Sequence, residues 1–442
     1  MRTLRSNLIS TEMVNIDEHT VRNTILFLLW AEFLWETYLS IRQFNKARRT
    51  NEVPPELKSI MEEDEFRKAR EYSLAKLTFG FIKDTHSILI TSAVIFYGIL
   101  AKVWDYSASV DPFKGEVTTS CIWLCILSLT STLLDLPLTI YYTFVLEEKF
   151  GFNKQTAGFF VWDKIKAFII SQIITGMIAS VVITIIKSGG QYFFVWLWAV
   201  VCVISLILLT IYPAVIAPLF DKYTPLPEGE LRTQIEALAS KLKFPLTQLY
   251  VVEGSKRSSH SNAYFYGLFK SKRIVLFDTL LAKDDGSGCS NDEILAVLSH
   301  ELGHWSYSHI IKNLVVMQVN LFLLFAGFSV MFKFPPLYKA VGFYKLQPVL
   351  VGLYVVLQYV MMPYNTLLSF LMTCLSRKFE FQADDFAVKL GKAEYLERAL
   401  LQLNKDNLGF PINDGWYSAW HHSHPPLLER IGVLRESASK LK

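Results

Sequence analysis

Long apolar segments recur along the chain and alternate with shorter polar stretches. About twenty apolar residues are needed to cross the hydrocarbon core of a bilayer. Seven segments approach or exceed this length, at roughly 22–42, 87–104, 119–146, 165–187, 191–219, 311–332 and 348–374. The first is the least apolar, because Glu32 and Glu36 lie within it. The pattern predicts a mostly α-helical, multi-pass membrane protein with seven transmembrane helices.

The termini and loops of these spans indicate an orientation. The first twenty residues are polar and contain no signal-peptide core, so we expect the first span to remain in the mature protein. The loop after span one is rich in Lys and Arg, whereas the loop after span two holds only Lys114. Because cytosolic loops carry the excess of positive charge, the N-terminus is predicted to be lumenal and the C-terminus cytosolic.

The polar blocks show different periodicities. Residues 45–75 are charged and predicted to be helical. In the long block 220–298, Glu230–Lys243 has the pattern of an amphipathic helix and Leu249–Glu253 that of a strand. Two further strand-like runs, 263–269 and 273–278, are predicted to form a β-hairpin, whose edge an extended peptide could pair with.

The C-terminal block is predicted to be helical to about 404, irregular after that, and helical again from about Pro425. The organisation expected from these patterns has four parts. They are an N-terminal membrane region with five transmembrane helices (1–219), a cytosolic metal-binding portion (220–310), transmembrane helices six and seven (311–374) and a C-terminal cytosolic region (375–442).

Composition supports a membrane protein and excludes some functions. The chain is 52% hydrophobic and 19% charged, against about a quarter charged in soluble proteins. The net charge is +4 and no aromatic-and-basic recognition module is visible, so nothing indicates nucleic-acid binding. Five cysteines without regular spacing argue against a disulfide framework.

The most informative motif is His300-Glu301-Leu-Gly-His304. Residues four apart share one helical face, so both imidazoles can reach one metal ion. Ser290 and Glu293 have the spacing of a capping box, so a helix can begin just before the motif. Glu301 would then serve as general base toward a water molecule that the metal activates. The alternative is a polar helical face with two solvated histidines.

Catalytic zinc usually has three protein ligands, so a third is required. Glu380 and Asp384 are four residues apart on the helix that continues the last span, so Glu380 could bind the metal while Asp384 holds a ligand histidine. A surface charge pair is the alternative. The cluster His421, His422 and His424 could bind metal, stabilise an oxyanion, or belong to a plain surface loop. The remaining candidates, His260 and His309, are expected to be structural or solvated.

Polar residues also occur within the spans. Asp135 lies in span three, and charges in a membrane usually face a protein interior or a wet cavity. We therefore expect the spans to enclose water. Interhelical hydrogen bonds are the alternative for the four amides, Gln318, Asn320, Gln358 and Asn365.

Six sequence blocks, in order along nearly the whole chain, resemble one family. They are Leu146–Thr156, Pro218–Leu226, Ser261–Gly267, His300–His304, Ser376–Asp384 and Ser418–Arg430. They resemble the Ste24-type CAAX prenyl proteases, zinc metalloproteases of the farnesylated-protein-converting enzyme family. The resemblance implies a barrel of seven transmembrane helices around an intramembrane chamber, with a cytosolic zincin-like portion.

The resemblance also implies roles for individual residues. One Zn²⁺ would be held by His300, His304 and Glu380, with Glu301 as general base. Asp384 would support a ligand. His424 would stabilise the tetrahedral intermediate or donate a proton, and Asn262 would contact the substrate backbone.

The activity implied is removal of the last three residues from prenylated, typically farnesylated, CaaX proteins; some members also cut farther upstream. The location implied is the endoplasmic reticulum membrane, with the inner nuclear membrane as a second site. A quality-control metalloprotease of the bacterial HtpX type is the nearest alternative, but such proteins have fewer spans. A transporter or channel would need no metal, and a pseudo-enzyme would not need the complete set of His300, Glu301, His304 and Glu380.

Overall fold

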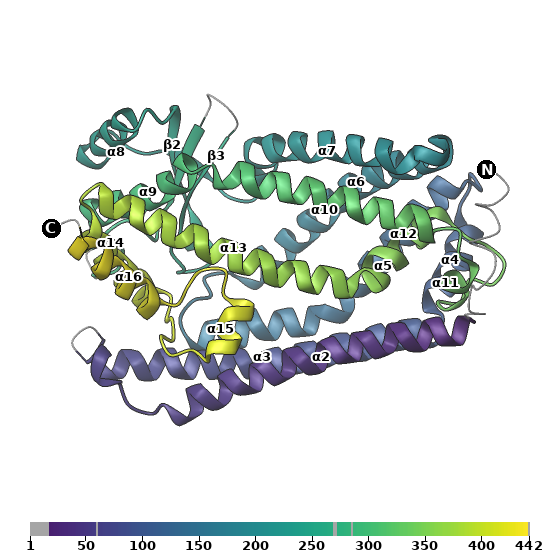
Figure 1. The fold of residues 1–442 in the computed structure, drawn as a ribbon, viewed down its shortest axis with the longest axis horizontal. Coiled ribbons are helices and arrows are strands. Elements are labelled where there is room, and N and C mark those ends of the chain that lie inside the picture. Colours follow the sequence, from purple (N-terminus) through teal and green to yellow (C-terminus); the bar gives the residue numbers. More distant parts are fainter. Residues whose placement is uncertain (1–16, 59–60, 268–271, 284–285, 441–442) are drawn as a thin grey trace, which may run out of the picture.

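The computed structural model describes residues 17–58, 61–267, 272–283 and 286–440, and helices dominate it (Figure 1). Six helical segments are long and apolar enough to cross a membrane, and a seventh is formed if one bent helix pair counts as one span. The six are α2 (Glu18–Arg49), α3 (Glu63–Phe96), α5 with the π-helical turn η2 (Glu116–Tyr141 and Tyr142–Glu147), α6 (Ala157–Ser188), the segment Gly190–Leu219 around α7 (Phe193–Ile211), and α10 (His309–Met331).

The seventh span is bent. It joins α12 (Val349–Val355) and the π-helical turn Val356–Val360 (η7) to α13 (Met362–Lys389), with an angle of 57° between the two parts. Pro363 lies at the start of α13, where a missing backbone N–H is tolerated. The prediction of a mostly helical, multi-pass membrane protein is confirmed.

Two local expectations were wrong. Residues 45–75 were predicted to be helical, but only their two ends are α-helical: α2 ends at Arg49 and α3 begins at Glu63, with Pro54 and the short 3₁₀ turn Pro55–Leu57 between them. The predicted span 87–104 combines the end of α3 with the start of a separate helix, α4 (Ile99–Val110). Gly98 separates them with a φ of 60°, a left-handed conformation that redirects the chain and favours glycine.

The spans form a closed ring. Contacts run from α2 to α3, from α3 to η2, from α5 through α6 and α7 to α10, and from α10 through η7 back to α2. In each of the six continuous spans, only 6–22% of the most apolar window is buried. Most side chains of these windows therefore do not pack inside the protein, and the main packed core of the spans is the cluster around Trp123, Ile183 and Phe328. Asp135, 60% exposed and 3.8 Å from His86, fits a wet interior, since lipid does not solvate a carboxylate.

A small mixed sheet lies between the fifth and sixth spans. Its order is β1–β2–β4–β3, formed by Tyr223–Pro225, Leu246–Val252, Lys272–Phe277 and Ala263–Tyr266. β2 and β4 are parallel, and β3 and β4 form the predicted antiparallel hairpin, whose connecting residues 268–271 lie outside the described part of the chain. Strand β3 is at the edge of the sheet.

Helices pack on this sheet and extend it into a compact unit. The helices α8 (Glu230–Lys241) and α9 (Asn291–Ser306) share a hydrophobic core with β2 and β4, centred on Ile274, Leu276 and Leu298. Beyond the membrane, α13 is followed by α14 (Ala393–Asp406), α15 (Gly415–His421) and α16 (Leu427–Lys440). The stretch predicted to be irregular therefore contains one short helix, which Asp414 caps by accepting from the backbone N–H groups of Trp416 and Tyr417.

Candidate metal centre

Helix α9 carries the two motif histidines, and its sequence explains its position. Ser290 and Glu293 form a complete capping box, in which the Ser290 backbone N–H donates to Glu293 Oε2 at 2.8 Å. Ile294 and Leu298 belong to the core shared with the sheet and are 1% exposed. Burial of this apolar face against the sheet directs His300 and His304 toward the opposite side, where α13 lies.

Three potential ligand atoms converge between α9 and α13. His300 Nε2 and His304 Nε2 are 3.2 Å apart, and the Glu380 carboxylate oxygens lie 3.5 Å from the first and 3.2 Å from the second. With metal–nitrogen bonds of about 2.0–2.1 Å, tetrahedral ligand atoms are about 3.3 Å apart. Two imidazoles and one carboxylate are also a typical catalytic zinc set. The residues therefore fit a zinc ion.

Close packing of α9 on α13 makes this convergence possible. Gly303 lies between His300 and His304 on α9. A Cβ added at Gly303 would be 3.0 Å from Ala383 Cα and 3.1 Å from Phe386 Cβ of α13. Any larger residue would push the helices apart. Glu380 and Asp384, one turn apart on α13, are 4% and 0% exposed, so they are not a surface charge pair.

The second ring nitrogen of His300 is held by a buried ion pair. His300 Nδ1 lies 2.8 Å from Asp384 Oδ1, and Arg430 of α16 donates to both Asp384 oxygens at 2.6 and 2.9 Å. The carboxylate accepts from both partners, which fixes His300 as the tautomer whose Nε2 lone pair faces the site. Sequence reasoning placed Asp384 near a ligand but did not find Arg430.

His304 has a comparable support that the sequence reasoning missed. His304 Nδ1 lies 2.9 Å from His309 Nδ1, and His309 Nε2 lies 2.9 Å from Gln382 Oε1. Gln382 Oε1 can only accept, so His309 Nε2 donates to it and His309 Nδ1 accepts from His304. His304 is thereby held with its Nε2 lone pair toward the site.

The position of His309 results from a break in the chain direction. On one continuous helix, a residue five positions after His304 would point away from the motif face. The chain instead leaves α9 after Ser306, and Ser308 adopts a left-handed φ of 56° before α10 begins. His309 is then buried, 2% exposed, and stacks on Phe379 at 3.9 Å. The polar, small Ser306-Tyr-Ser308 stretch was the available signal of this break.

Burial and neighbouring charges shift the pKa values of several groups in the site. Burial raises the pKa of Glu301, and charge on His300 and His304 opposes that rise. Burial opposes protonation of His300, but the Asp384 and Glu380 carboxylates outweigh it and raise its pKa to about 9. A metal ion must therefore displace a proton from this group when it binds. Arg430 stays charged, since the adjacent Asp384 outweighs burial and raises its pKa.

The three histidines near the C-terminus contact three different partners. His424 Nδ1 lies 2.8 Å from Glu380 Oε2, although its side chain is 71% exposed. His421 instead pairs with Glu36 of α2 at 3.2 Å, and His422 lies against Ser418 at 3.3 Å. Of these three, only His424 joins the metal centre.

The other two candidates lie along the polar block before the motif. Asn262 is exposed immediately before β3, and its Oδ1 accepts from the Ala263 N–H at 2.8 Å. Within the described ranges, no hydrogen bond joins Asn262 to the His-His-Glu group. His260 is structural: it stacks on Phe152 at 4.0 Å and lies 2.9 Å from Asn407 Oδ1.

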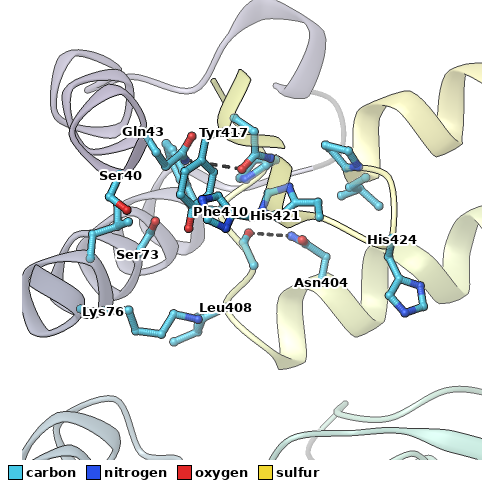
Figure 2. Close-up of a pocket in the computed structure, with 18 of the residues that line it drawn as sticks. Ser40, Gln43, Ser73, Lys76, Asn404, Leu408, Phe410, Tyr417, His421 and His424 are labelled. Atoms are coloured by element: carbon cyan, nitrogen blue, oxygen red, sulfur yellow. Dashed lines mark hydrogen bonds between the residues drawn. The ribbon is translucent and has the colours of Figure 1, made fainter. Parts of the chain in front are cut away.

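Two cavities border the metal centre. One of 280 Å³ is lined by Glu301, His304 and Glu380, by Tyr264 and Phe265 of β3, and by residues at the start of α10. The other, of 610 Å³, lies between α2, α3 and the C-terminal segment (Figure 2). His424 lines both cavities, and its Nδ1 lies 2.8 Å from Glu380 Oε2.

Comparisons with known proteins agree with this site. Residues 43–222 match the CAAX prenyl protease N-terminal family, described as five membrane helices, and residues 225–438 match peptidase family M48. The CAAX prenyl protease 1 homolog of Homo sapiens is 47% identical, with 95% of this chain and 96% of that protein covered. CAAX prenyl protease 1 of Saccharomyces cerevisiae is 38% identical, with 93% and 94% covered.

A solved structure extends the similarity to three dimensions. The crystal structure of S. mikatae Ste24p matches with a TM-score of 0.88 at 38% sequence identity, covering 93% of this chain and 98% of that one. The fold, the metal-binding motif and these matches agree along nearly the whole length. The chain therefore belongs to peptidase family M48 and, within it, to the Ste24-type CAAX prenyl proteases, which are membrane metalloendopeptidases.

Proposed function

We propose that this protein is a zinc-dependent endopeptidase that removes the C-terminal aaX tripeptide from prenylated CaaX proteins. The observation that carries the proposal is the buried convergence of His300, His304 and Glu380, with Glu301 in the adjoining cavity beside the edge strand β3. The names of the relatives support the substrate class.

The chemistry needs few groups. A zinc ion held by His300, His304 and Glu380 would acidify a water molecule and polarise the scissile carbonyl. Glu301 lines the cavity next to these ligands, and its carboxylate takes the proton of the attacking water. His424 then donates to the developing oxyanion or protonates the leaving amine, because its Nδ1 faces Glu380 and no described residue bonds to its other ring nitrogen.

The edge strand supplies a means of holding the substrate. Phe277 N–H donates to Asn262 C=O, so the alternating antiparallel pattern directs the backbone groups of Tyr264 to β4 and those of Phe265 to the open edge. An extended peptide can add to this edge by main-chain hydrogen bonds. We assign Asn262, at the start of the strand, to the substrate backbone.

The membrane position suits a lipidated substrate. Each buried CH₂ of a prenyl chain contributes about 0.8 kcal/mol to partitioning into lipid. A site at the end of a hollow helical ring can receive such a tail from the bilayer. We place the metal centre and C-terminus in the cytosol, the N-terminus in the lumen, and the protein in the endoplasmic reticulum membrane, with the inner nuclear membrane as a second location.

The test is cleavage of a farnesylated CaaX peptide by the purified, detergent-solubilised protein. Wild type is compared with Glu301→Gln and with Glu293→Gln, a control on the same helix that preserves the capping box, because Gln also suits that position. Bound zinc is measured by mass spectrometry. We expect wild type and Glu293→Gln to release the tripeptide, and Glu301→Gln to lose at least about a hundredfold in rate with its zinc retained.

Three results would count against the proposal. Cleavage by Glu301→Gln at the wild-type rate would exclude it as general base. Unchanged cleavage after complete chelation of the metal would exclude zinc chemistry. An inert wild type that is folded and zinc-loaded would refute the substrate, and cleavage of unfolded membrane proteins in its place would favour a quality-control role.

A further inference from the structure

The 610 Å³ cavity shown in Figure 2 has walls of mixed character. Ser40 and Gln43 of α2 and Ser73 and Lys76 of α3 line one side. Leu408 and Phe410, in the segment that follows α14, line the other. His424 lines both this cavity and the 280 Å³ cavity that contains His304 and Glu380, so the two cavities adjoin the same residue.

Lys76 is the notable charge in this cavity. Figure 2 shows it extending from its helix toward the segment that contains Leu408. Its ammonium lies 4.1 Å from the centroid of the Tyr72 ring, and within the described part of the chain no ion pair joins it to a carboxylate. Glu147, the acid behind Tyr72, is occupied by the Tyr72 hydroxyl at 2.7 Å and His260 at 3.4 Å. Lys76 is thus available to an anion.

The acids of the cavity lie elsewhere. Glu36 accepts from Trp420 Nε1 at 2.7 Å and pairs with His421 at 3.2 Å. Asp84 is eight residues after Lys76 on the same helix, about 12 Å farther along its axis. One end of the cavity therefore presents a cation, and the acidic groups do not neutralise it there.

We propose that this cavity binds the three-residue tail on the carboxyl side of the scissile bond, and that the Lys76 ammonium binds the α-carboxylate of its last residue. The inference rests on the proposed function and deepens it. The residues of α3 that line the cavity run from Ser73 to Asp84, about 16 Å along the helix axis, which is enough for three extended residues at about 10 Å. Leu77, Leu408 and Phe410 offer apolar contacts to aliphatic side chains, and Asn404 and Ser73 offer polar ones to the peptide backbone.

This assignment also gives the substrate a direction. The 280 Å³ cavity on the other side of His424 is lined by Ile310 and Phe379 at the start of α10 and on α13, two helices of the membrane ring. We assign this smaller cavity to the residues on the amino side of the scissile bond, including the prenylated cysteine. The charged end and the lipidated end are thereby received on opposite sides of the metal centre.

The test compares a farnesylated CaaX peptide bearing a free C-terminal carboxylate with the same peptide bearing a C-terminal amide. kcat/KM is measured for wild type, Lys76→Gln, Lys76→Arg and Lys68→Gln. Lys68, on the same helix, is the control: its side chain is 61% exposed and lies 3.8 Å from Asp64, outside the cavity. Zinc content and thermal unfolding show that each variant is folded and loaded.

Since a charge-assisted hydrogen bond is at stake, wild type should prefer the acid over the amide by about tenfold in kcat/KM. Lys76→Gln should bring this ratio close to one, Lys76→Arg should restore most of it, and Lys68→Gln should keep it. Equal cleavage of acid and amide by wild type would overturn the inference and leave the proposed function intact. An undiminished ratio in Lys76→Gln would also overturn it, whereas a wild type that cuts neither peptide would refute the function itself.

Discussion

At the scale of single residues, both candidate ligand imidazoles, His300 and His304, have their outer nitrogens engaged. Asp384 and Arg430 hold His300, and His309 and Gln382 hold His304. Such partners orient ligands and raise their affinity for the metal. The two supports differ in kind, because one is a buried ion pair and the other a neutral relay.

Replacement of His309 by Phe tests the neutral relay. Phe retains the ring that stacks on Phe379 but removes the acceptor for His304 Nδ1. We expect zinc affinity to fall by about 10–100-fold. Competition with a graded chelator measures it, and exposed His19→Gln is the control. Unchanged affinity in His309→Phe would mean that the relay does not support His304.

His422 provides a pH-dependent contribution to stability. Burial, then the charges of His421 and Arg377, lower its pKa to about 4 from its ordinary value of 6.5. Below pH 6.5 the unfolded chain binds a proton that the folded chain does not bind until about pH 4, so stability falls as the pH drops through this window. Above pH 6.5 the contribution is complete.

The measurement is thermal unfolding in detergent at pH 7 and pH 5. We expect the wild-type Tm to be lower at pH 5, and the decrease to be smaller by about 2–4 °C in His422→Gln, which cannot titrate. His19→Gln, altered at an exposed position on α2, should retain the full decrease. An equal decrease in His422→Gln would show that this histidine does not carry the effect.

At the scale of elements, the position of the third ligand is decided by how closely α9 and α13 pack. Each helix follows from its own sequence, α9 from its capping box and apolar face, and α13 as the extension of the last span. The distance between the two helices does not follow from either sequence alone, because it depends on which small residues meet where the helices cross. Gly303 meets Ala383 there.

Gly303→Ala tests this crossing. The added Cβ would lie 3.0 Å from Ala383 Cα, so α9 and α13 must shift by a few tenths of an ångström at the crossing that positions Glu380 beside the histidines. We expect zinc affinity and activity to fall together, by up to about tenfold, because a metal site must be held to within about 0.5 Å.

Gly176→Ala in α6 is the matched control, because nothing lies within 4 Å of its added Cβ. Both variants replace a helical glycine with a better helix former. Zinc content and peptide cleavage that are the same in Gly303→Ala as in Gly176→Ala would contradict the role of the close crossing.

At the scale of the whole molecule, a hollow ring of helices leads to a protease unit at one end. The loop after α2 is rich in Lys and Arg, and the loop between α4 and α5 contains only Lys114. From the positive-inside rule we therefore expect the first loop to be cytosolic and the second to be lumenal.

Glycosylation mapping checks this topology. An Asn-x-Ser acceptor on a flexible insert after Lys114 should be glycosylated in microsomes, whereas the same insert after Asn51 should not, because only lumenal acceptors are modified. Both variants must still cleave substrate, which controls for misfolding. Glycosylation of the Asn51 insert alone would show that the protein has the opposite orientation.

Much of the fold could be read from local pattern. Apolar runs of bilayer length determined the spans, period-two runs the β3–β4 hairpin, and spacing along one helix the pairing of His300 with His304, since all of these depend on neighbours in the chain. Local pattern did not distinguish His421, His422 and His424; the family resemblance singled out His424, and the tertiary structure places it beside Glu380. The tertiary structure also shows that the break at Ser308 brings His309 into contact with His304. It shows as well that α9 and α13 lie close enough for Glu380 to join His300 and His304 as a candidate ligand. Periodicity specifies which face of an element a residue occupies, whereas the distance between elements depends on how side chains remote in sequence pack together.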